Sequence, residues 1–158
     1  MEAIQQNHAV GISIAAFLIA VAVSLVYYQF IYIPEVNTKP AFSNTILYPK
    51  ESVHIRIAEG AAIESNPQNF VPKDVRGTIG LSNRITWTNT DSTSHTVTSD
   101  TGYVDIINGK FDSTDHLGSL ISPGKTFEFT FTKIGEYAYH CEPHPYMRGK
   151  AEIVDNFS

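Results

Sequence analysis

Three side chains with metal-binding chemistry lie close together near the C-terminus, in the stretch YHCEPHPYM. Cys141, His144 and Met147 follow one another at intervals of three residues, and Cys141 is the only cysteine of the chain. Pro143 and Pro145 lie between them, and proline disfavours both a regular helix and a laddered strand. The spacing therefore predicts a tight loop that turns a thiolate, an imidazole and a thioether toward one point. This soft donor set, the thioether in particular, suits copper(I) rather than zinc.

A fourth donor has to come from elsewhere in the chain. His95 is the candidate, because it starts the short β-branched segment HTVTS directly after a turn expected at 91–94. Two histidines, one cysteine and a weak axial methionine form the ligand set of a blue-copper electron-transfer centre. Taken alone, Cys141 also fits a buried structural cysteine or the nucleophile of a Cys–His pair. Neither alternative accounts for Met147 or for the prolines, and a single thiol excludes disulfides and sites that need two thiolates.

Alternating apolar residues predict that β-strands hold these side chains in place. In KTFEFTFTK, for example, Phe127, Phe129 and Phe131 point to one face and polar residues to the other. Turns rich in glycine, proline and asparagine separate the segments. The predicted strands occupy residues 52–58, 83–90, 95–99, 125–133, 136–141 and 150–154. Several short strands over roughly 105 residues, with no sustained helical periodicity after residue 34, are typical of an all-β, antiparallel-rich sandwich.

The N-terminal segment has a different character. Residues 9–33 contain no charged side chain, and as a helix they would span roughly 37 Å, more than the roughly 30 Å of a bilayer core. Three tyrosines gather at the end of this segment, where aromatic rings favour the membrane interface. A cleaved signal peptide is the alternative, but the basic region that opens such a peptide is missing. We therefore expect a tail and single transmembrane α-helix at 1–33, an extended tether at 34–50 and the β-domain at 51–158.

The net charge excludes one class of function, and the remaining histidines are expected to lie away from the predicted ligands. A formal net charge of −5 and a pI of about 5.6 argue against a nucleic-acid binder. His54 and His140 alternate outward from apolar strand faces and are expected to be solvated or covered surface positions. His116 lies in a predicted loop, where Asp112 and Asp115 make it a weak candidate for a second metal site.

The block GEYAYHCEPHPYMRGKAEIV resembles the C-terminal part of cupredoxins, and it is most similar to amicyanin-, pseudoazurin- and plastocyanin-type domains. The likeness extends upstream through FVPKDVRGTIGLSNRITWTNTDSTSHTVTSD and FDSTDHLGSLISPGKTFEFTFTKIG, so that it covers about residues 70–154. It implies a Greek-key β-sandwich with one type 1 copper ion, whose ligands are His95, Cys141, His144 and the axial Met147. Thr96 departs from the asparagine that many cupredoxins carry after the first histidine. The resemblance therefore does not extend to the rigidity or redox tuning of that position.

The same resemblance implies a protein that carries single electrons by Cu(II)/Cu(I) cycling and is not an enzyme. A copper carrier or storage protein, or a copper subunit of a larger membrane redox complex, is the alternative. Redox proteins are expected to dock at the small apolar patch of His144, Pro145 and Tyr146. Cupredoxins are extracytoplasmic, so we expect a cytoplasmic N-terminus and a copper domain on the periplasmic or outer side. Lys39 alone is a weak positive-inside signal for the opposite orientation.

Overall fold

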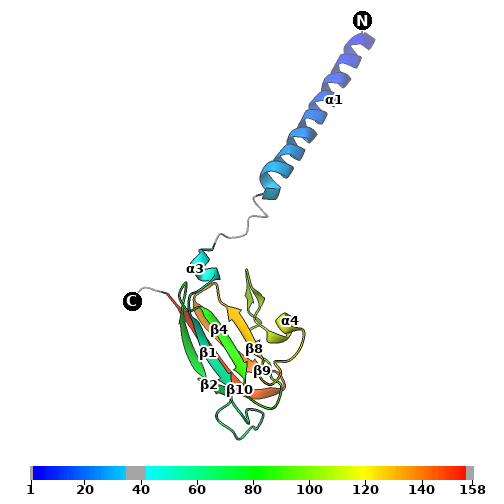
Figure 1. Cartoon of the computed structure of the whole chain (residues 1–158). Coiled ribbons are helices and arrows are strands. Elements are labelled where there is room, and N and C mark those ends of the chain that lie inside the picture. The colour runs from blue at the N-terminus through cyan, green and yellow to red at the C-terminus, as the bar shows by residue number, and fades with distance from the viewer. Residues whose placement is uncertain (1, 35–41, 156–158) are drawn as a thin grey trace. The chain divides into compact units, whose positions relative to one another are not determined.

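The chain is seen here in a computed structural model that describes residues 2–34 and 42–155 (Figure 1). It divides into two compact units, Met1–Ala41 and Phe42–Ser158, and each unit is described by itself.

The N-terminal unit is one long helix. α1 spans Glu2–Tyr27 and continues into a π-helical turn, η1, at Tyr28–Tyr32. The segment Ser13–Tyr32 has 20 residues with a mean hydropathy of 2.2, and none of its most apolar stretch is buried within the chain. At 1.5 Å per residue it is about 30 Å long, which is the thickness of the hydrocarbon core of a bilayer. Its length and composition fit a membrane span, and they fit a signal sequence as well.

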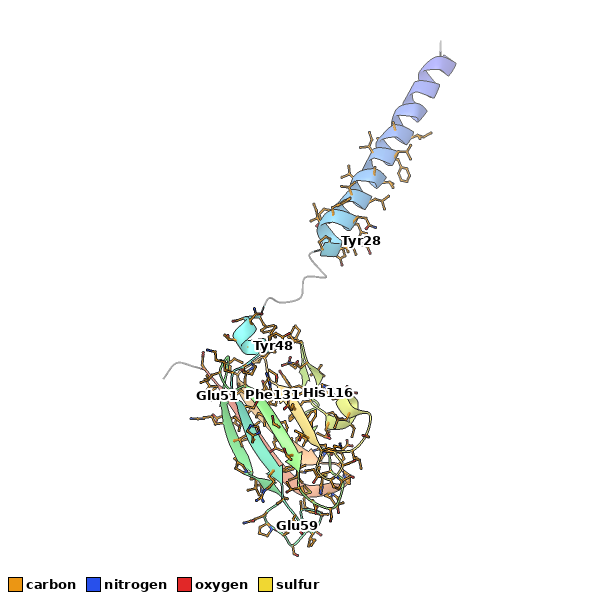
Figure 2. The ribbon with its side chains drawn as sticks, viewed as in Figure 1. Tyr28, Tyr48, Glu51, Glu59, His116 and Phe131 are labelled. Carbon is orange, nitrogen blue, oxygen red and sulfur yellow. The ribbon has the colours of Figure 1, made fainter. Side chains whose placement is uncertain are left out.

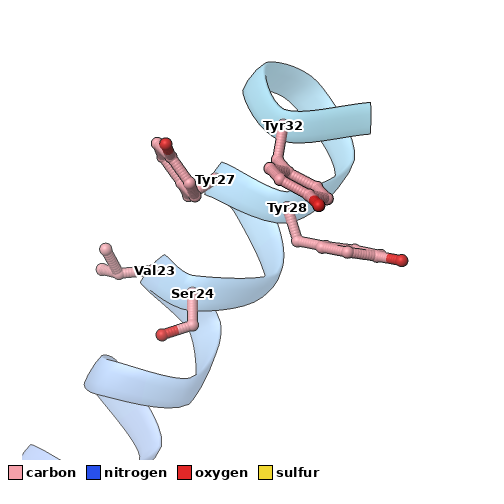
Figure 3. Close-up of a pocket in the computed structure, with 5 residues that line it drawn as sticks. All are labelled: Val23, Ser24, Tyr27, Tyr28 and Tyr32. Atoms are coloured by element: carbon pink, nitrogen blue, oxygen red, sulfur yellow. The ribbon is translucent and has the colours of Figure 1, made fainter. Parts of the chain in front are cut away.

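Three tyrosines line a shallow groove at the C-terminal end of this helix (Figure 3). The rings of Tyr28 and Tyr32 stack with centroids 5.6 Å apart, and Tyr27, Val23 and Ser24 complete the groove. Phenol rings with an apolar body and a polar tip are enriched at membrane interfaces. The groove is open on an exposed helix, unlike the concave pockets that enclose small molecules.

The second unit is a sandwich of two four-stranded sheets. One sheet has the strand order β2-β1-β4-β8 and the other β3-β10-β9-β5, and β6 and β7 form a separate hairpin. The strand bounds are β1 Ser52–Ile57, β2 Phe70–Val71, β3 Asp74–Thr78, β4 Arg84–Asn89, β5 Thr98–Ser99, β6 Val104–Asp105, β7 Gly109–Lys110, β8 Thr126–Thr130, β9 Gly135–Cys141 and β10 His144–Val154. Two pairs, β1 with β4 and β3 with β10, are parallel. The other five pairs in the described chain are antiparallel, so the prediction of an antiparallel-rich sheet is confirmed.

The core lies between the two sheets and follows the predicted alternation. β8 buries Phe127 and Phe129, and Phe131 directly after the strand is buried as well. Trp87 of β4 and Tyr139 of β9 meet between the sheets, with ring centroids 5.4 Å apart in an edge-to-face arrangement. Full burial of such a side chain contributes about 1.5–3 kcal/mol relative to exposure, so this aromatic cluster is a main source of attachment between the sheets. An all-β sandwich preceded by one apolar helix is what the sequence predicts.

The structure differs from the expected tether at 34–50. Residues 35–41 lie outside the described residues, but a short helix, α3, forms at Asn44–Leu47 and begins with a serine cap. The Ile46 carbonyl accepts a hydrogen bond of 2.8 Å from Asn83 Nδ2, which joins α3 to the sandwich. The second part of the expected tether therefore belongs to the folded unit. A four-residue helix shows too little periodicity to be predicted from apolar spacing.

A second short helix, α4 at Ser113–Leu117, occupies the predicted loop that contains His116. The Asp112 carboxylate caps it by accepting a 2.9 Å hydrogen bond from Thr114 N. Gly118 ends it with φ 66°, a left-handed conformation that glycine adopts without steric cost. The Asp112 cap at its start and Gly118 at its end together explain why this polar stretch forms a short helix.

Candidate metal centre

Three predicted ligands meet at one end of the sandwich. The ligand atoms of His95, Cys141 and His144 all lie within 4.8 Å of one another, in the cluster of the described residues that could hold a metal ion. Cys141 Sγ lies 3.6 Å from His95 Nδ1 and 3.6 Å from His144 Nδ1. His95 and Cys141 are fully buried, whereas His144 is half-buried. The fold thus brings a distant histidine to the Cys–His loop.

The separations match what a single metal ion requires. Bonds of about 2.3 Å to a thiolate and about 2.0 Å to an imidazole, at angles between tetrahedral and trigonal, place sulfur and nitrogen roughly 3.5–3.8 Å apart. Both sulfur–nitrogen distances lie in this range. A thiolate and two imidazoles, with the thioether of Met147 in the same loop as Cys141 and His144, are donors that copper prefers. The residues present therefore fit a copper ion.

The loop from Cys141 to Met147 is a bulge between two paired strands. β9 ends at Cys141 and β10 begins at His144, and these two residues are Cα partners. Pairing resumes with Arg148 opposite His140 after a register shift, so the residues between have no partner on β9. The interruption expected from the prolines is present, although β10 starts earlier than predicted. Met147 is fully buried here, and its side chain joins the apolar core that contains Cys141.

His95 reaches the site from a different part of the chain. His95 and Ile121 exchange two backbone hydrogen bonds, of 3.2 and 2.8 Å, as an isolated β-bridge. The side-chain amide of Asn89, at the end of β4, donates to the carbonyls of Thr93 and Ile121, each at 2.8 Å. These bonds hold the turn that precedes His95. Of the strand predicted to start at His95, only Thr98–Ser99 pair with β9.

A buried carboxylate holds the far side of the His95 ring. Asp91 Oδ2 lies 2.9 Å from His95 Nε2, which leaves the opposite ring nitrogen directed at Cys141. The carboxylate also accepts hydrogen bonds from three backbone N–H groups, those of Gly60, Ala62 and Ser92. Burial opposes ionisation, but the bond from His95 and these N–H groups lower the pKa of Asp91 to about 2. Asp91 is therefore an anion at neutral pH, and it orients and polarises the imidazole.

In the sequence, Asp91 is recognisable only as part of the predicted turn and as an acidic residue four positions before the candidate ligand His95. Its approach to the ring depends on the turn closing tightly, which the Asn89 amide ensures.

Burial also governs the protonation of two donors. It lowers the pKa of His95, against the opposing effect of Asp91, so the imidazole is neutral at pH 7. It raises the pKa of the Cys141 thiol, although the amides of Thr96 and His144 act in the opposite direction. Metal binding requires a neutral imidazole and a deprotonated thiol. Binding therefore displaces the thiol proton and strengthens as the pH rises.

Thr96 links the two loops that supply the donors. Its backbone N–H donates to Cys141 Sγ at 3.3 Å, and its hydroxyl accepts a 2.8 Å hydrogen bond from Glu142 N. Thr96 therefore bonds to the loop from Cys141 to Met147 through both its backbone and its side chain, although it replaces the asparagine that many cupredoxins carry at this position.

The remaining candidates lie elsewhere. Asp112 accepts from Lys110 Nζ at 2.8 Å, and His116 Nε2 lies 2.8 Å from the Lys110 carbonyl. These side chains form no metal-binding cluster among the described residues. His140 is half-buried and pairs with Asp100, so it faces away from the metal centre as predicted.

Comparison with known proteins agrees with this geometry. Residues 57–154 match the family described as copper binding proteins, plastocyanin/azurin family. The chain is similar to amicyanin of Paracoccus denitrificans, with 26% identity over 116 residues that cover 72% of this chain and 82% of the relative. It is also similar to amicyanin-alpha of Methylorubrum extorquens, with 29% identity over 105 residues that cover 66% of this chain and 74% of the relative.

A solved structure shows the same fold. The novel purple cupredoxin of Nitrosopumilus maritimus aligns with a TM-score of 0.51 and 25% identity, over 65% of this chain and 99% of that protein. Because the family match covers more than half of the sequence and the fold and donor set agree with it, this chain is a cupredoxin, a member of the plastocyanin/azurin family of copper-binding proteins.

Proposed function

We propose that this chain is a membrane-anchored blue copper protein, in which His95, Cys141 and His144 bind one copper ion and Met147 is the axial ligand. Membership of the family implies a copper-binding electron-transfer protein. The observation that supports the ligand assignment is the pair of 3.6 Å distances from the sulfur of the only cysteine to two imidazole nitrogens. When bound, copper supplies a one-electron Cu(II)/Cu(I) couple.

The residues around the donors prepare the site for electron transfer. Asp91 fixes the ring of His95, and Thr96 holds the sulfur of Cys141 from the neighbouring loop. Donors held in this way move little when the charge of the site changes. Cys141 and Met147 are shielded from water, while half-buried His144 leaves one ring edge near the surface. That edge is the proposed exit for the electron.

Burial of the donors also bears on the alternative of a copper carrier. A carrier has to release its metal to a partner, which favours exposed and exchangeable ligands. His95, Cys141 and Met147 are each 0% exposed, which supports retained copper and an electron carrier. The two functions are separated by measuring electron self-exchange and copper release to a chelator. Fast release with slow self-exchange would favour the carrier.

The proposed docking surface for redox proteins is formed by His144, Pro145 and Tyr146. Pro145 is exposed and the two rings are half-buried. The Tyr146 hydroxyl donates to the Ala62 carbonyl, which joins this surface to the loop after β1. Exposed carboxylates are present on the neighbouring loops, at Glu59, Glu64 and Glu142. They support a partner with a basic rim, whose association rate falls as ionic strength rises.

The proposal includes a membrane anchor and the side of the membrane on which the copper unit lies. The segment Ser13–Tyr32 is the proposed span, with the N-terminus in the cytoplasm and the copper unit outside, where cupredoxins usually reside. An anchored chain stays in the membrane pellet after alkaline extraction. Protease added to cells whose outer envelope is permeabilised but whose cytoplasmic membrane is intact is expected to digest the copper unit. Digestion only after lysis of the cytoplasmic membrane would contradict the orientation.

The ligand assignment is tested by adding Cu(II) to the full chain in detergent. We expect one copper per chain and an intense visible absorption band that ascorbate bleaches. Cys141→Ala should remove the band, whereas His140→Ala should keep it, because His140 neighbours the cysteine but pairs with Asp100. Met147→Gln should keep the band and lower the reduction potential. A band that survives Cys141→Ala refutes the proposal, and an unchanged potential excludes Met147 as axial ligand.

A further inference from the structure

We infer that the end of the sandwich opposite the metal centre rests on the lipid surface of the membrane, so that the metal centre faces away from the bilayer. The inference rests on the proposed function, because it requires Ser13–Tyr32 to be a membrane anchor.

The direction of strand β9 distinguishes the two ends of the sandwich. β9 runs from Gly135 to Cys141, so the β8–β9 turn lies at the end opposite the metal centre. At roughly 3.3 Å per residue, the two ends of this strand are about 20 Å apart. Figure 2 shows Tyr48, which follows α3, at one end of the sandwich and Glu59, in the loop after β1, at the other. We call the end with Tyr48 the basal end.

Hydrogen bonds from two asparagines bring separate segments together at the basal end. Asn83, between β3 and β4, donates to the Ile46 carbonyl of α3 at 2.8 Å and to the Phe131 carbonyl after β8 at 2.7 Å. Asn108, in the β6–β7 hairpin, donates to the Thr130 carbonyl at 2.7 Å. Helix α3, the β3–β4 turn, the β8–β9 turn and the β6–β7 hairpin therefore share this end.

Exposed apolar side chains collect on these same segments. Nine large hydrophobic side chains are exposed in the described part of the folded unit, and six of them lie at the basal end. We call these six the basal patch, and they are Tyr48, Leu81, Val104, Ile106, Ile107 and Ile134. Single exposed apolar residues are normal, but their concentration at one end marks an interaction surface.

The short connection between the proposed span and the folded unit indicates that the bilayer covers the basal patch. Ten residue steps separate Tyr32, the last residue of the proposed span, from Phe42, the first residue of the folded unit. Even fully extended they reach at most about 36 Å. Because α3 begins two residues after Phe42 and is bonded to the basal end, the anchor keeps that end, rather than the metal centre, within reach of the lipid.

The charges at the basal end are also compatible with a lipid surface. Lys50 and Lys133 are exposed beside Tyr48 and Ile134. Exposed carboxylates are present at this end as well, at Glu51, Glu136 and Asp155, and Glu136 pairs with Lys150 at 3.4 Å. Apolar side chains accompanied by lysines are the composition of surfaces that lie at a lipid interface, where the amines meet headgroup phosphates. The exposed carboxylates Glu59, Glu64 and Glu142 lie in the loop after β1 and in the copper loop.

The test places one new tryptophan at either end of the full chain. Ile106→Trp lies in the basal patch, and Ile63→Trp is the matched control, because Ile106 is 59% exposed and Ile63 is 58% exposed. Ile63 follows Ala62, which bonds to Asp91 and Tyr146 near the metal centre. The native Trp87 is fully buried and gives a constant background. Each chain is reconstituted, without copper, into phosphatidylcholine vesicles that contain lipids with or without brominated acyl chains.

We expect brominated lipid to quench the added emission of Ile106→Trp about two-fold, as for a side chain at the acyl boundary. Ile63→Trp and the unmodified chain should keep their emission. Equal quenching of both variants, or quenching of neither, overturns the inference. A blue-shifted Ile106→Trp emission that bromine does not quench also overturns it, and would indicate that a second copy or another protein covers the patch.

Two controls keep the outcomes separate. If the unmodified chain does not float with the vesicles, the proposed anchor fails and the inference fails with it. If the chain floats but Ile106→Trp is not quenched, the inference alone fails. Far-UV circular dichroism checks the fold of each variant. Val104→Trp, at a side chain that is 64% exposed, takes the place of Ile106→Trp if that variant does not fold.

Discussion

Replacing Asp91 by asparagine removes a buried charge that touches a proposed copper ligand without being a ligand itself. In the native chain, Oδ2 faces both His95 Nε2 and Ala62 N, while Oδ1 accepts from Gly60 and Ser92. An asparagine has only one acceptor oxygen. If that oxygen keeps the two bonds of Oδ1, the amide NH₂ faces the N–H groups of His95 and Ala62, and these donors lose their acceptor.

The expected size of the effect follows from this loss. Removing a partner of this kind from a ligating histidine costs about 10–100-fold in metal affinity. The carboxylate makes the imidazole more electron-rich, which favours Cu(II) over Cu(I), so Asp91→Asn raises the reduction potential. Each tenfold loss confined to Cu(II) raises a one-electron potential by about 59 mV, which places the upper bound at roughly 120 mV.

The assay is a redox titration of the full chain, together with competition for Cu(II) against a chelator. Asp105→Asn is the matched control, because Asp105 is also a buried carboxylate that accepts several hydrogen bonds, but at the basal end. Both variants should lose about 1–3 kcal/mol of unfolding free energy per unsatisfied donor. Only Asp91→Asn should change the potential and the Cu(II) affinity. An unchanged potential, or an equal shift in both variants, would refute the role assigned to Asp91.

Three further outcomes are expected. Gly149→Ala should lower the unfolding free energy by about 1–3 kcal/mol, because its Cβ would lie within 3.0 Å of three atoms of the buried Tyr139 side chain, including the hydroxyl oxygen. Since Tyr139→Phe removes that oxygen, adding it to the same chain should restore part of the loss in urea unfolding. Thr96→Val leaves Glu142 N without its acceptor, so it should destabilise the metal-free chain by about 1–3 kcal/mol and shift the potential, whereas Thr96→Ser should do neither. Burial alone would raise the pKa of Asp105, but its hydrogen bonds lower it below 3.8, so its contribution to stability is present above that pH and lost as the pH falls through the folded pKa. Urea midpoints of the metal-free chain between pH 5 and 2 should therefore fall less steeply in Asp105→Asn, and an equal slope would contradict this origin.

The features that the sequence predicts well are those that depend on short-range patterns. The apolar helix follows from an uninterrupted run of uncharged residues, and the strands follow from alternation, as in Phe127 and Phe129. The donors Cys141, His144 and Met147 lie within seven residues, so their spacing and the prolines between them already indicate one loop. Local backbone geometry determines such patterns, and they need no knowledge of distant contacts.

Other features arise only when distant segments pack together. The hydrogen bond that Glu142 N donates to the Thr96 hydroxyl joins residues 46 positions apart, and α3 is held by Asn83, 37 positions after Ile46. The parallel pairing of β1 with β4, the approach of Asp91 to His95 and the gathering of the basal patch likewise depend on the arrangement of whole strands and turns. The sequence by itself determined which side chains are able to hold copper and which segment is able to span a membrane. The tertiary structure decided what surrounds those side chains, because burial and hydrogen bonding between distant residues exist only in the folded chain.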